Sequence, residues 1–310
     1  MDFNYANITS DFLSEEIRDG YLVTNTNKKI WAIELDLLAK LLDVCKNNGI
    51  KVFAFAGTLL GAVRHHGFIP WDDDIDVCML QEDFIKLERI AKDEFESPYF
   101  LQTARTDPRY FFGYARLRNS DTTGIINWNA SLDYNNGIYV DIFVLNGIPE
   151  DDKRLIKLLN KRDFIHKLLN TYYKSYRKKG IKKIGQSIIS SLLQKVIDYD
   201  SLIDIYRNTL STYDNEPKRY ALLTHDWDFI HKYWCPTYSF EKTVELPFEC
   251  ISIPAPLNYN EILINIYGDY MRYPPVDERG KWHQNMVVYD PDVSYIEYMK
   301  LHENLFTNSK

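Results

Sequence analysis

The architecture of this chain follows from residues 51–80, which have the sequence KVFAFAGTLLGAVRHHGFIPWDDDIDVCML. A short apolar run predicts a strand over residues 51–56, and Gly57-Thr58 then predicts a tight turn into a short helix over residues 59–65. A second apolar run predicts another strand over residues 75–80. Four acidic residues lie among the five positions where this strand begins: Asp72, Asp73, Asp74 and Asp76.

Elements of both types surround this stretch. Apolar residues at helical spacing predict helices over residues 28–48 and 82–95, and further strands are predicted over residues 99–104, 111–118 and 137–143. Strands that mix with helices in this way favour an α+β protein with a mixed β-sheet core and flanking helices. Residues 153–183 are predicted to be helical and hold twelve Lys or Arg against one acid, Asp163, so they form a basic helical insertion.

Changes in predicted secondary structure and in charge along the sequence divide the chain into four predicted parts. An N-terminal extension covers residues 1–27, and the catalytic core covers residues 28–149, ending where Pro149 breaks the pattern. The basic helical segment covers residues 150–213. The remaining part, residues 214–310, is predicted to be α+β and to complete the substrate cleft.

The acidic cluster needs an explanation because neighbouring carboxylates repel one another. At the start of a strand with apolar neighbours, a cation is required to keep them ionised and ordered, and oxygen ligands suit Mg²⁺ or Mn²⁺. The two-residue alternation of a strand points Asp74 and Asp76 to one face. A third acid, Asp141, lies in the predicted strand over residues 137–143. We therefore predict that these three residues hold the metal and are catalytic.

Such a triad suits phosphoryl or nucleotidyl transfer, because metal ions clamp the attacking and leaving oxygens around the phosphate. Asp141 would activate the acceptor hydroxyl. Gly57 and Thr58 lie where a strand turns into a helix, so their backbone N–H groups are predicted to bind a donor phosphate. Arg64, with His65 and His66, would add cationic donors.

Other interpretations of the acids remain. Asp72-x-Asp74-x-Asp76 opens like a calcium-binding loop, but Val77 stands where that loop needs glycine. The cluster also fits a solvated acidic turn without function. Asp74-Ile75-Asp76 by itself resembles the metal motif of a nucleotide-sugar glycosyltransferase.

Composition excludes other classes. The net charge of −7 disfavours a general nucleic-acid binder, whose affinity comes from clustered cations. The four cysteines show no paired spacing, so neither a zinc site nor a disulfide framework is indicated. No signal peptide or membrane-spanning run is recognised, which predicts a cytoplasmic protein. The basic segment, with its interleaved apolar residues Leu155, Leu158 and Leu169, fits either a peripheral contact with an anionic membrane or a charged outer face over a core.

Several longer stretches together resemble the LicD family. They are residues 57–77, 115–119, 141–149 and 267–275, and the similarity extends over about residues 28–283. This family includes phosphocholine transferases and covers the related fukutin-type ribitol-phosphate transferases. Two positions depart from its pattern: Arg116 stands where the family commonly has Lys, and Asn146 where it commonly has Asp.

The resemblance implies a nucleotidyltransferase-like fold, magnesium, a CDP-linked donor such as CDP-choline, and a cell-surface polysaccharide or teichoic-acid precursor as acceptor. Arg116 is then a candidate for contact with the donor phosphates. Trp71 is a candidate for stacking on the base or on a choline ammonium, since cation–π contacts hold quaternary amines. Arg279 and His283 are candidates for late basic contacts with the phosphates.

The resulting hypothesis is a metal-dependent transfer of phosphocholine, or of a similar phospho-alcohol, from a CDP conjugate to a glycan or lipid-linked glycan hydroxyl. The protein would be cytoplasmic, with a peripheral position at the inner face of the membrane. Two alternatives stay open, a metal-dependent nucleotide-sugar glycosyltransferase and a non-catalytic relative that binds glycan or choline. The released nucleotide separates the two enzymes.

Overall fold

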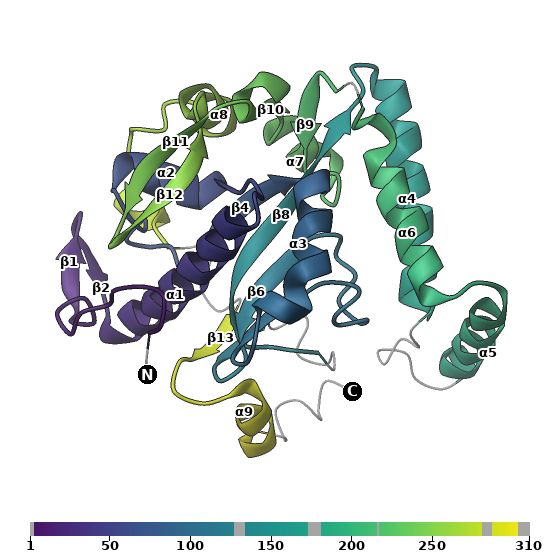
Figure 1. The fold of residues 1–310 in the computed structure, drawn as a ribbon, viewed down its shortest axis with the longest axis horizontal. Coiled ribbons are helices and arrows are strands. Elements are labelled where there is room, and N and C mark those ends of the chain that lie inside the picture. Colours follow the sequence, from purple (N-terminus) through teal and green to yellow (C-terminus); the bar gives the residue numbers. More distant parts are fainter. Residues whose placement is uncertain (1–2, 127–133, 173–180, 216, 281–286, 303–310) are drawn as a thin grey trace.

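A computed structural model describes residues 3–126, 134–172, 181–215, 217–280 and 287–302 (Figure 1). Its helices are α1 (Asn25–Asn47), α2 (Ala56–Arg64), α3 (Gln81–Glu94), α4 (Asp152–Tyr172), α5 (Ile181–Val196), α6 (Tyr199–Leu210), α7 (Trp227–Lys232), α8 (Tyr259–Tyr267) and α9 (Tyr295–Leu301). Its strands are β1 (Glu16–Arg18), β2 (Tyr21–Val23), β3 (Phe53–Ala54), β4 (Asp76–Leu80), β5 (Tyr99–Gln102), β6 (Ala115–Asn119), β7 (Thr123–Ile126), β8 (Ile138–Ile148), β9 (Arg219–Ala221), β10 (Cys235–Pro236), β11 (Thr243–Phe248), β12 (Ile251–Pro256) and β13 (Val287–Asp290). The predicted α+β class is confirmed.

The long strand β8 organises the main sheet. It pairs in parallel with β4, and it pairs antiparallel with β6 through its first half and with β9 near its end. The described strands follow the order β10-β9-β8-β4-β3, and β5 joins through β6. Parallel and antiparallel pairs in one sheet make it the mixed sheet that the sequence predicts.

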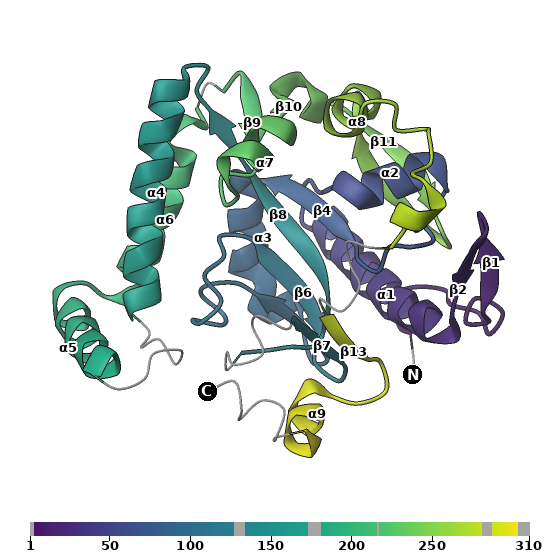
Figure 2. The same ribbon diagram turned by 180° about the vertical axis from the view of Figure 1, so that it is seen from behind.

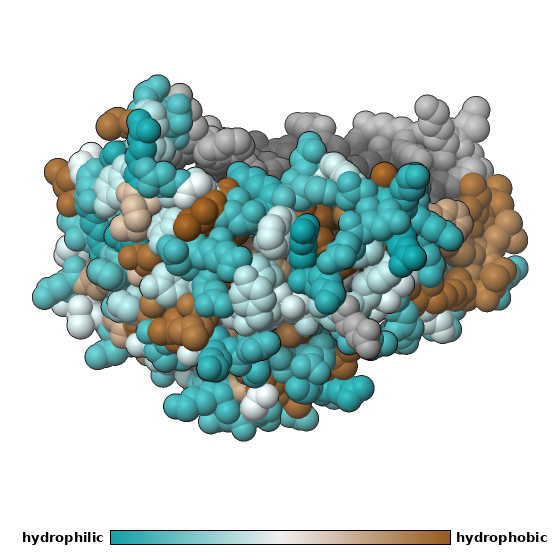
Figure 3. Space-filling model, turned by 90° about the horizontal axis from the view of Figure 1, so that it is seen from above, coloured by the Kyte–Doolittle hydropathy of each residue, from teal (hydrophilic) through white to brown (hydrophobic). Residues whose placement is uncertain are grey.

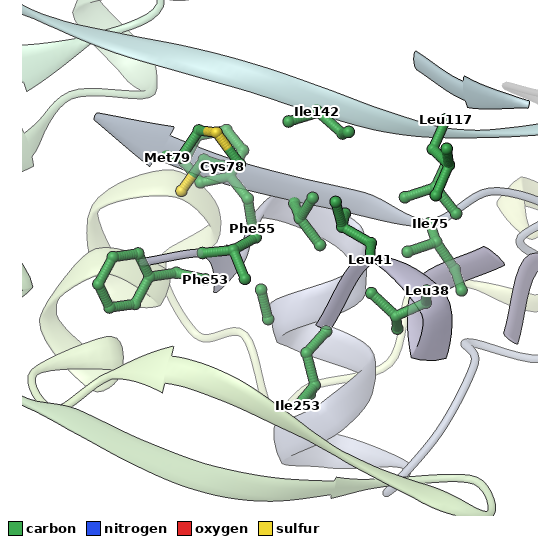
Figure 4. Packing of buried hydrophobic residues seen from close by; sticks show 14 of the residues in the cluster. Leu38, Leu41, Phe53, Phe55, Ile75, Cys78, Met79, Leu117, Ile142 and Ile253 are labelled. Carbon is green, nitrogen blue, oxygen red and sulfur yellow. The ribbon is translucent and has the colours of Figure 1, made fainter. Parts of the chain in front are cut away.

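Helices α1 and α3 lie on the same face of this sheet, in front of it in Figure 1 and behind it in Figure 2. The α1 helix begins where the Thr24 side chain accepts a hydrogen bond from the Asn27 N–H at 3.2 Å. Figure 4 shows Leu38 and Leu41 of α1 directed toward Ile75 and the sheet. These contacts fix α1 against the start of β4.

A second apolar cluster joins the helical segment to the far end of β8. It contains Leu155, Leu158 and Leu169 of α4 together with Leu202 of α6 and Ile148. The interleaved residues Leu155, Leu158 and Leu169 of the basic segment are therefore core, whereas several apolar residues of α5 are exposed. Contact of this segment with a membrane stays a prediction, as do the four predicted parts of the chain.

Several predicted boundaries are wrong. The helix expected over residues 59–65 begins three residues earlier, at Ala56. The strand expected over residues 75–80 begins at Asp76, so Asp74 lies in the preceding loop and strand alternation does not orient it. The strand expected over residues 111–118 begins only at Ala115. In the described parts of the chain, no helix combines the length and the apolar character needed to cross a membrane.

Candidate active site

The acidic loop, residues 72–74, lies directly before β4 and gathers three carboxylates. Asp72, Asp73 and Asp74 are half-buried, and each offers one ligand atom within 4.8 Å of the others. The loop is anchored by α1, because the Trp31 ring N–H donates to the Asp72 carbonyl at 3.0 Å. It is anchored again from the C-terminal part, where the Tyr289 hydroxyl donates to the Asp73 carbonyl at 3.3 Å.

Asp76 and Asp141 lie beside each other on neighbouring parallel strands. They are register partners of β4 and β8, and the Asp141 N–H donates to the Ile75 carbonyl at 2.9 Å. Val77 and Ile142, the next residues of the two strands, are buried in the core under α1. Alternation along each strand therefore turns Asp76 and Asp141 to the opposite face of the sheet.

The predicted triad is thus brought together in part. Asp76 and Asp141 share a face of the sheet. Asp74 lies two residues before Asp76, in the loop that leads into β4. Within the described ranges, however, the acids whose ligand atoms already converge are those of the acidic loop. The assignment of Asp74, Asp76 and Asp141 as metal ligands stays a prediction.

Arg116 makes a buried ion pair with Asp141. Its Nε lies 2.6 Å from Asp141 Oδ1 and its Nη2 lies 3.4 Å from Asp141 Oδ2. Burial alone would lower the pKa of Arg116, but Asp141 raises it well above its usual range. The third nitrogen, Nη1, is buried and has no hydrogen-bond partner among the residues that the structure describes. The guanidinium therefore touches a predicted catalytic acid, and its predicted contact with a donor phosphate stays untested.

Gly57 and Thr58 form the first turn of α2, which faces the acidic loop. A Cβ atom on Gly57 would lie 2.9 Å from Asp72 Oδ2, so glycine leaves room for that carboxylate. Thr58 is buried, and its hydroxyl accepts a hydrogen bond from the Asp76 N–H at 2.7 Å. Both residues therefore contact the acids directly, and their predicted role in phosphate binding stays a prediction.

Arg64 lies at the other end of α2. It follows Gly57 by seven positions, so the two residues are about 10 Å apart along the helix axis. Its Nη1 donates to the Tyr270 carbonyl at 2.8 Å, and its guanidinium lies 4.9 Å from the centre of the Tyr273 ring. The structure therefore groups Arg64 with the C-terminal part of the chain rather than with the first turn of α2.

Trp71 belongs to a cluster of rings and cations beside the acidic loop. The Arg279 guanidinium lies 4.7 Å from the centre of its ring, and the rings of His65 and Tyr273 lie 5.9 Å and 6.1 Å away. Two predicted residues, Trp71 and Arg279, are thus in contact with each other. A cleft of about 440 Å³ opens beside them, lined in part by Arg64 and His65. His283 lies outside the described residues.

Glu34 is a site residue that the sequence analysis missed. It lies on α1, is 1% exposed, and its Oε2 has no hydrogen-bond partner among the described residues. Burial raises its pKa well above the usual range, and Asp74 and Asp73 raise it further. The signal was present, because Glu34 follows Ile30 by four positions and so falls on the apolar face of the helix.

Two further neighbours come from distant segments. The ring of His225 stacks on Phe229 with centroids 4.2 Å apart; burial lowers its pKa, whereas Asp141 raises it. Burial raises the pKa of Tyr289 well above its usual range, and Tyr139 and Asp73 act in the same direction. No local pattern identifies these residues, since only the folded chain brings them to the acids.

The donor set fits a hard divalent cation. Every acid in and under the loop offers carboxylate oxygens, and the buried Oε2 of Glu34 has no hydrogen-bond partner in the part of the chain that the structure describes. Oxygen-only ligands suit Mg²⁺ or Mn²⁺. Close by lie Asp141, which is paired with the buried Arg116, and the first turn of α2.

Comparison with known proteins gives a family and several relatives. Residues 49–167 match the family described as LicD/FKTN/FKRP, nucleotidyltransferase domain. The lipopolysaccharide cholinephosphotransferase LicD of Haemophilus influenzae is 25% identical over 254 residues, which are 80% of this chain and 92% of the relative. An uncharacterised protein of Rickettsia prowazekii is 35% identical over 109 residues, which are 35% of this chain and 37% of that protein.

Proposed function

The chain belongs to the LicD family and is a LicD-type phosphotransferase, and from this premise we propose that it transfers phosphocholine or a similar phospho-alcohol. The donor is a CDP conjugate, with CDP-choline first among the candidates. The acceptor is a hydroxyl of a cell-surface glycan or of a teichoic-acid precursor. The Haemophilus relative is a lipopolysaccharide cholinephosphotransferase, which supports transfer of choline phosphate in general. The observation that carries the proposal is the pairing of Asp76 with Asp141 beside the acidic loop.

Metal binding is part of the proposal. Asp74, Asp76 and Asp141 would hold Mg²⁺ or Mn²⁺, with Asp72 and Asp73 of the acidic loop and the buried Glu34 contributing negative charge nearby. The ion would supply the positive charge that neutralises the donor phosphates during transfer.

The protein's own groups would then position and deprotonate the acceptor. The acceptor oxygen forms a bond to the phosphorus that carries choline, while the bond from this phosphorus to the CMP oxygen breaks and CMP leaves. Asp141 takes the hydroxyl proton, and Arg116, whose Nε lies 2.6 Å from Asp141 Oδ1, holds that carboxylate in place.

The donor would lie across the first turn of α2. The N–H groups of Gly57 and Thr58 would face its phosphates, and Arg116 would supply its unpartnered Nη1. At the outer end, Trp71 would exchange its contact with Arg279 for the base or the choline ammonium. Arg64, Arg279 and His283 would then be available to the phosphates or to the acceptor.

The proposal includes the cellular setting of the reaction. We place the enzyme in the cytoplasm, where CDP conjugates are made, with a peripheral position at the inner face of the membrane. A lipid-linked glycan acceptor would then be within its reach.

Turnover with CDP-choline tests the proposal. The assay measures CMP release in the presence of a glycan acceptor, with Mg²⁺ or with chelator, for the native chain and for Asp74→Asn and Asp141→Asn. Each substitution should lower kcat by at least about a hundredfold. Mutation of residues that only hydrogen-bond to a metal ligand already lowers activity by up to about a hundredfold, and these acids are proposed to bind the metal directly. Asp121→Asn, at an exposed acid, is the matched control.

The outcomes are distinct. Near-normal turnover in either active-site variant would contradict the metal-triad proposal. Turnover with CDP-ribitol or CDP-glycerol instead of CDP-choline would keep the chemistry and change the cargo. Release of a nucleoside diphosphate from a UDP-sugar would establish the glycosyltransferase alternative.

A further inference from the structure

Helix α5 stands away from the sheet. Both ribbon views place it beyond the end of the α4–α6 pair, with the main sheet on the other side of that pair (Figures 1 and 2). Its described outer residues are strongly exposed and apolar: Ile188 is 56% exposed, Ile189 58%, Leu192 57% and Val196 84%. Hydrophobic surface gathers at the same end of the molecule in Figure 3.

These four residues share one face of the helix. At 3.6 residues per turn, they fall within an arc of roughly 100°. On the opposite side of α5, the polar residues Ser190 and Gln194 contact the end of α4. Ser190 is fully buried and its hydroxyl donates to the Tyr172 carbonyl at 2.8 Å, and the Gln194 amide donates to the same carbonyl at 2.8 Å. The helix is therefore attached through its polar side and presents its apolar side outward, the reverse of an ordinary surface helix.

The surroundings of this face are positively charged. Lys195 is exposed on α5, and Lys167 is exposed near the end of α4 that contacts α5. The sequence from residue 174 to residue 183, directly before and into α5, carries six Lys or Arg and no acid, in a chain whose net charge is −7. Of the acids that follow α5, Asp198 caps α6 by accepting from the Ser201 N–H at 2.8 Å, and Asp200 and Asp204 are paired with Arg105 at 2.8 Å and 2.5 Å. An apolar face among cations is complementary to an anionic lipid surface.

We infer that the outward face of α5 docks the protein on an anionic lipid bilayer, with the helix lying in the plane of the interface. Its 16 residues are fewer than the roughly 20 that span a bilayer, so the helix lies along the surface. A second copy of the chain fits this face less well, because pairing would bring two basic segments together. The inference rests on the peripheral membrane position in the proposed function and assigns it a face, but it uses no step of the proposed reaction, so docking and phosphocholine transfer can fail separately.

Co-flotation of the full chain with vesicles tests this inference. Vesicles of phosphatidylcholine with phosphatidylglycerol should bind the native chain, and vesicles of phosphatidylcholine alone should bind it much more weakly. Binding should weaken as salt is raised, because each lysine near the surface contributes about fivefold in affinity through screened attraction. The double variant Ile188→Gln/Leu192→Gln should lose at least about tenfold in partitioning.

A matched control separates the face from general hydrophobicity. Ile17→Gln/Leu22→Gln removes two side chains that are 74% and 53% exposed on the β1–β2 hairpin, and it should bind vesicles like the native chain. Circular dichroism would confirm that both double variants are folded. The inference is overturned if the α5 variant binds anionic vesicles as the native chain does, or if the native chain does not bind anionic vesicles. A native dimer that the α5 variant converts to monomer, without vesicle binding, would overturn it in favour of a second copy.

Discussion

At the residue scale, the pair Arg116–Asp141 carries a large part of the site's electrostatics. Both side chains are nearly buried, and the guanidinium also lies 4.0 Å from the centre of the Tyr139 ring. Removing one member of such a pair leaves an uncompensated charge in the protein interior. The pair therefore links the stability of the fold to the chemistry of Asp141.

We expect Arg116→Gln to lower the free energy of unfolding by about 3–5 kcal/mol, because Asp141 then remains buried without its counter-charge. Urea unfolding measures this change. Arg154→Gln is the control, since Arg154 is 70% exposed and 3.9 Å from Asp151, and surface pairs contribute at most about 1 kcal/mol. Equal effects of the two substitutions would show that the Arg116 pair adds nothing to stability.

Single residues also show where sequence reasoning stops. Asp141 and Arg116 were both identified, one from strand alternation and the other from family resemblance, but their contact was not. They lie 25 positions apart in the chain, and only the antiparallel register of β6 with β8 makes them partners. The alternation along one strand predicts which face each side chain takes, but it does not identify the residue that lies opposite on the neighbouring strand.

At the element scale, the short helix α2 depends on a close approach of its own loop. A Cβ atom at Gly61 would lie 2.4 Å from the Gly67 carbonyl oxygen, which is backbone and cannot rotate away. The Gly67 N–H also donates to the Gly61 carbonyl at 3.4 Å. The loop that leads to the acids is therefore folded back tightly over α2.

Gly61→Ala should destabilise the protein by about 1–3 kcal/mol, although alanine favours a helix more than glycine does. The reason is the clash with the Gly67 carbonyl, which would also displace the chain leading to Trp71 and the acidic loop. Thermal unfolding measures the loss. Gly49→Ala is not a suitable control because Gly49 has a positive φ of 63°. The difference in stability between Arg89→Ala and Arg89→Gly, at an exposed position in the middle of α3, gives the helix-propensity contribution alone. A stabilised Gly61→Ala protein would contradict this account of the loop.

The long helices and strands were predicted well, and so was the short strand β5, but several other short strands were not predicted. Helices α1 and α3 and strands β4 and β8 all follow from apolar periodicity, with boundaries shifted by a few residues. Strands β7, β9, β10 and β13 were missed. They have two to four residues each, and β13 pairs with β7 across more than 160 positions, as in Tyr289 with Gly124. Tertiary pairing, rather than local propensity, creates such strands.

At the scale of the whole molecule, the acids are held by segments from three parts of the chain. Helix α1 supplies Trp31 and Glu34, the loop before β4 supplies the carboxylates, and β13 supplies Tyr289. Mutual repulsion of these carboxylates opposes the docking of all three segments. A bound cation should relieve this repulsion and so stabilise the fold as a unit.

Mg²⁺ should therefore raise the free energy of unfolding, by about 2.7 kcal/mol at a hundred times its dissociation constant, and chelator should remove the gain. In chelator, Glu34→Gln should be more stable than the native chain by about 1–3 kcal/mol at neutral pH. Burial and the neighbouring Asp74 and Asp73 raise the pKa of Glu34, so folding disfavours its ionised form, whereas an amide carries no such cost. Glu15→Gln, at an exposed position, is the control. Denaturant titrations with and without Mg²⁺ measure both effects, and a Glu34→Gln protein that is less stable in chelator would contradict them.

The contact between Tyr289 and the Asp73 carbonyl has a consequence for biosynthesis. The acidic loop leaves the ribosome early, while the strand that carries Tyr289 follows more than 200 codons later. During that interval the acidic loop of the nascent chain lacks the hydrogen bond from the Tyr289 hydroxyl to the Asp73 carbonyl. Translation must pass residue 289 before the site reaches its final form, so an incomplete polypeptide would be made without a finished active centre.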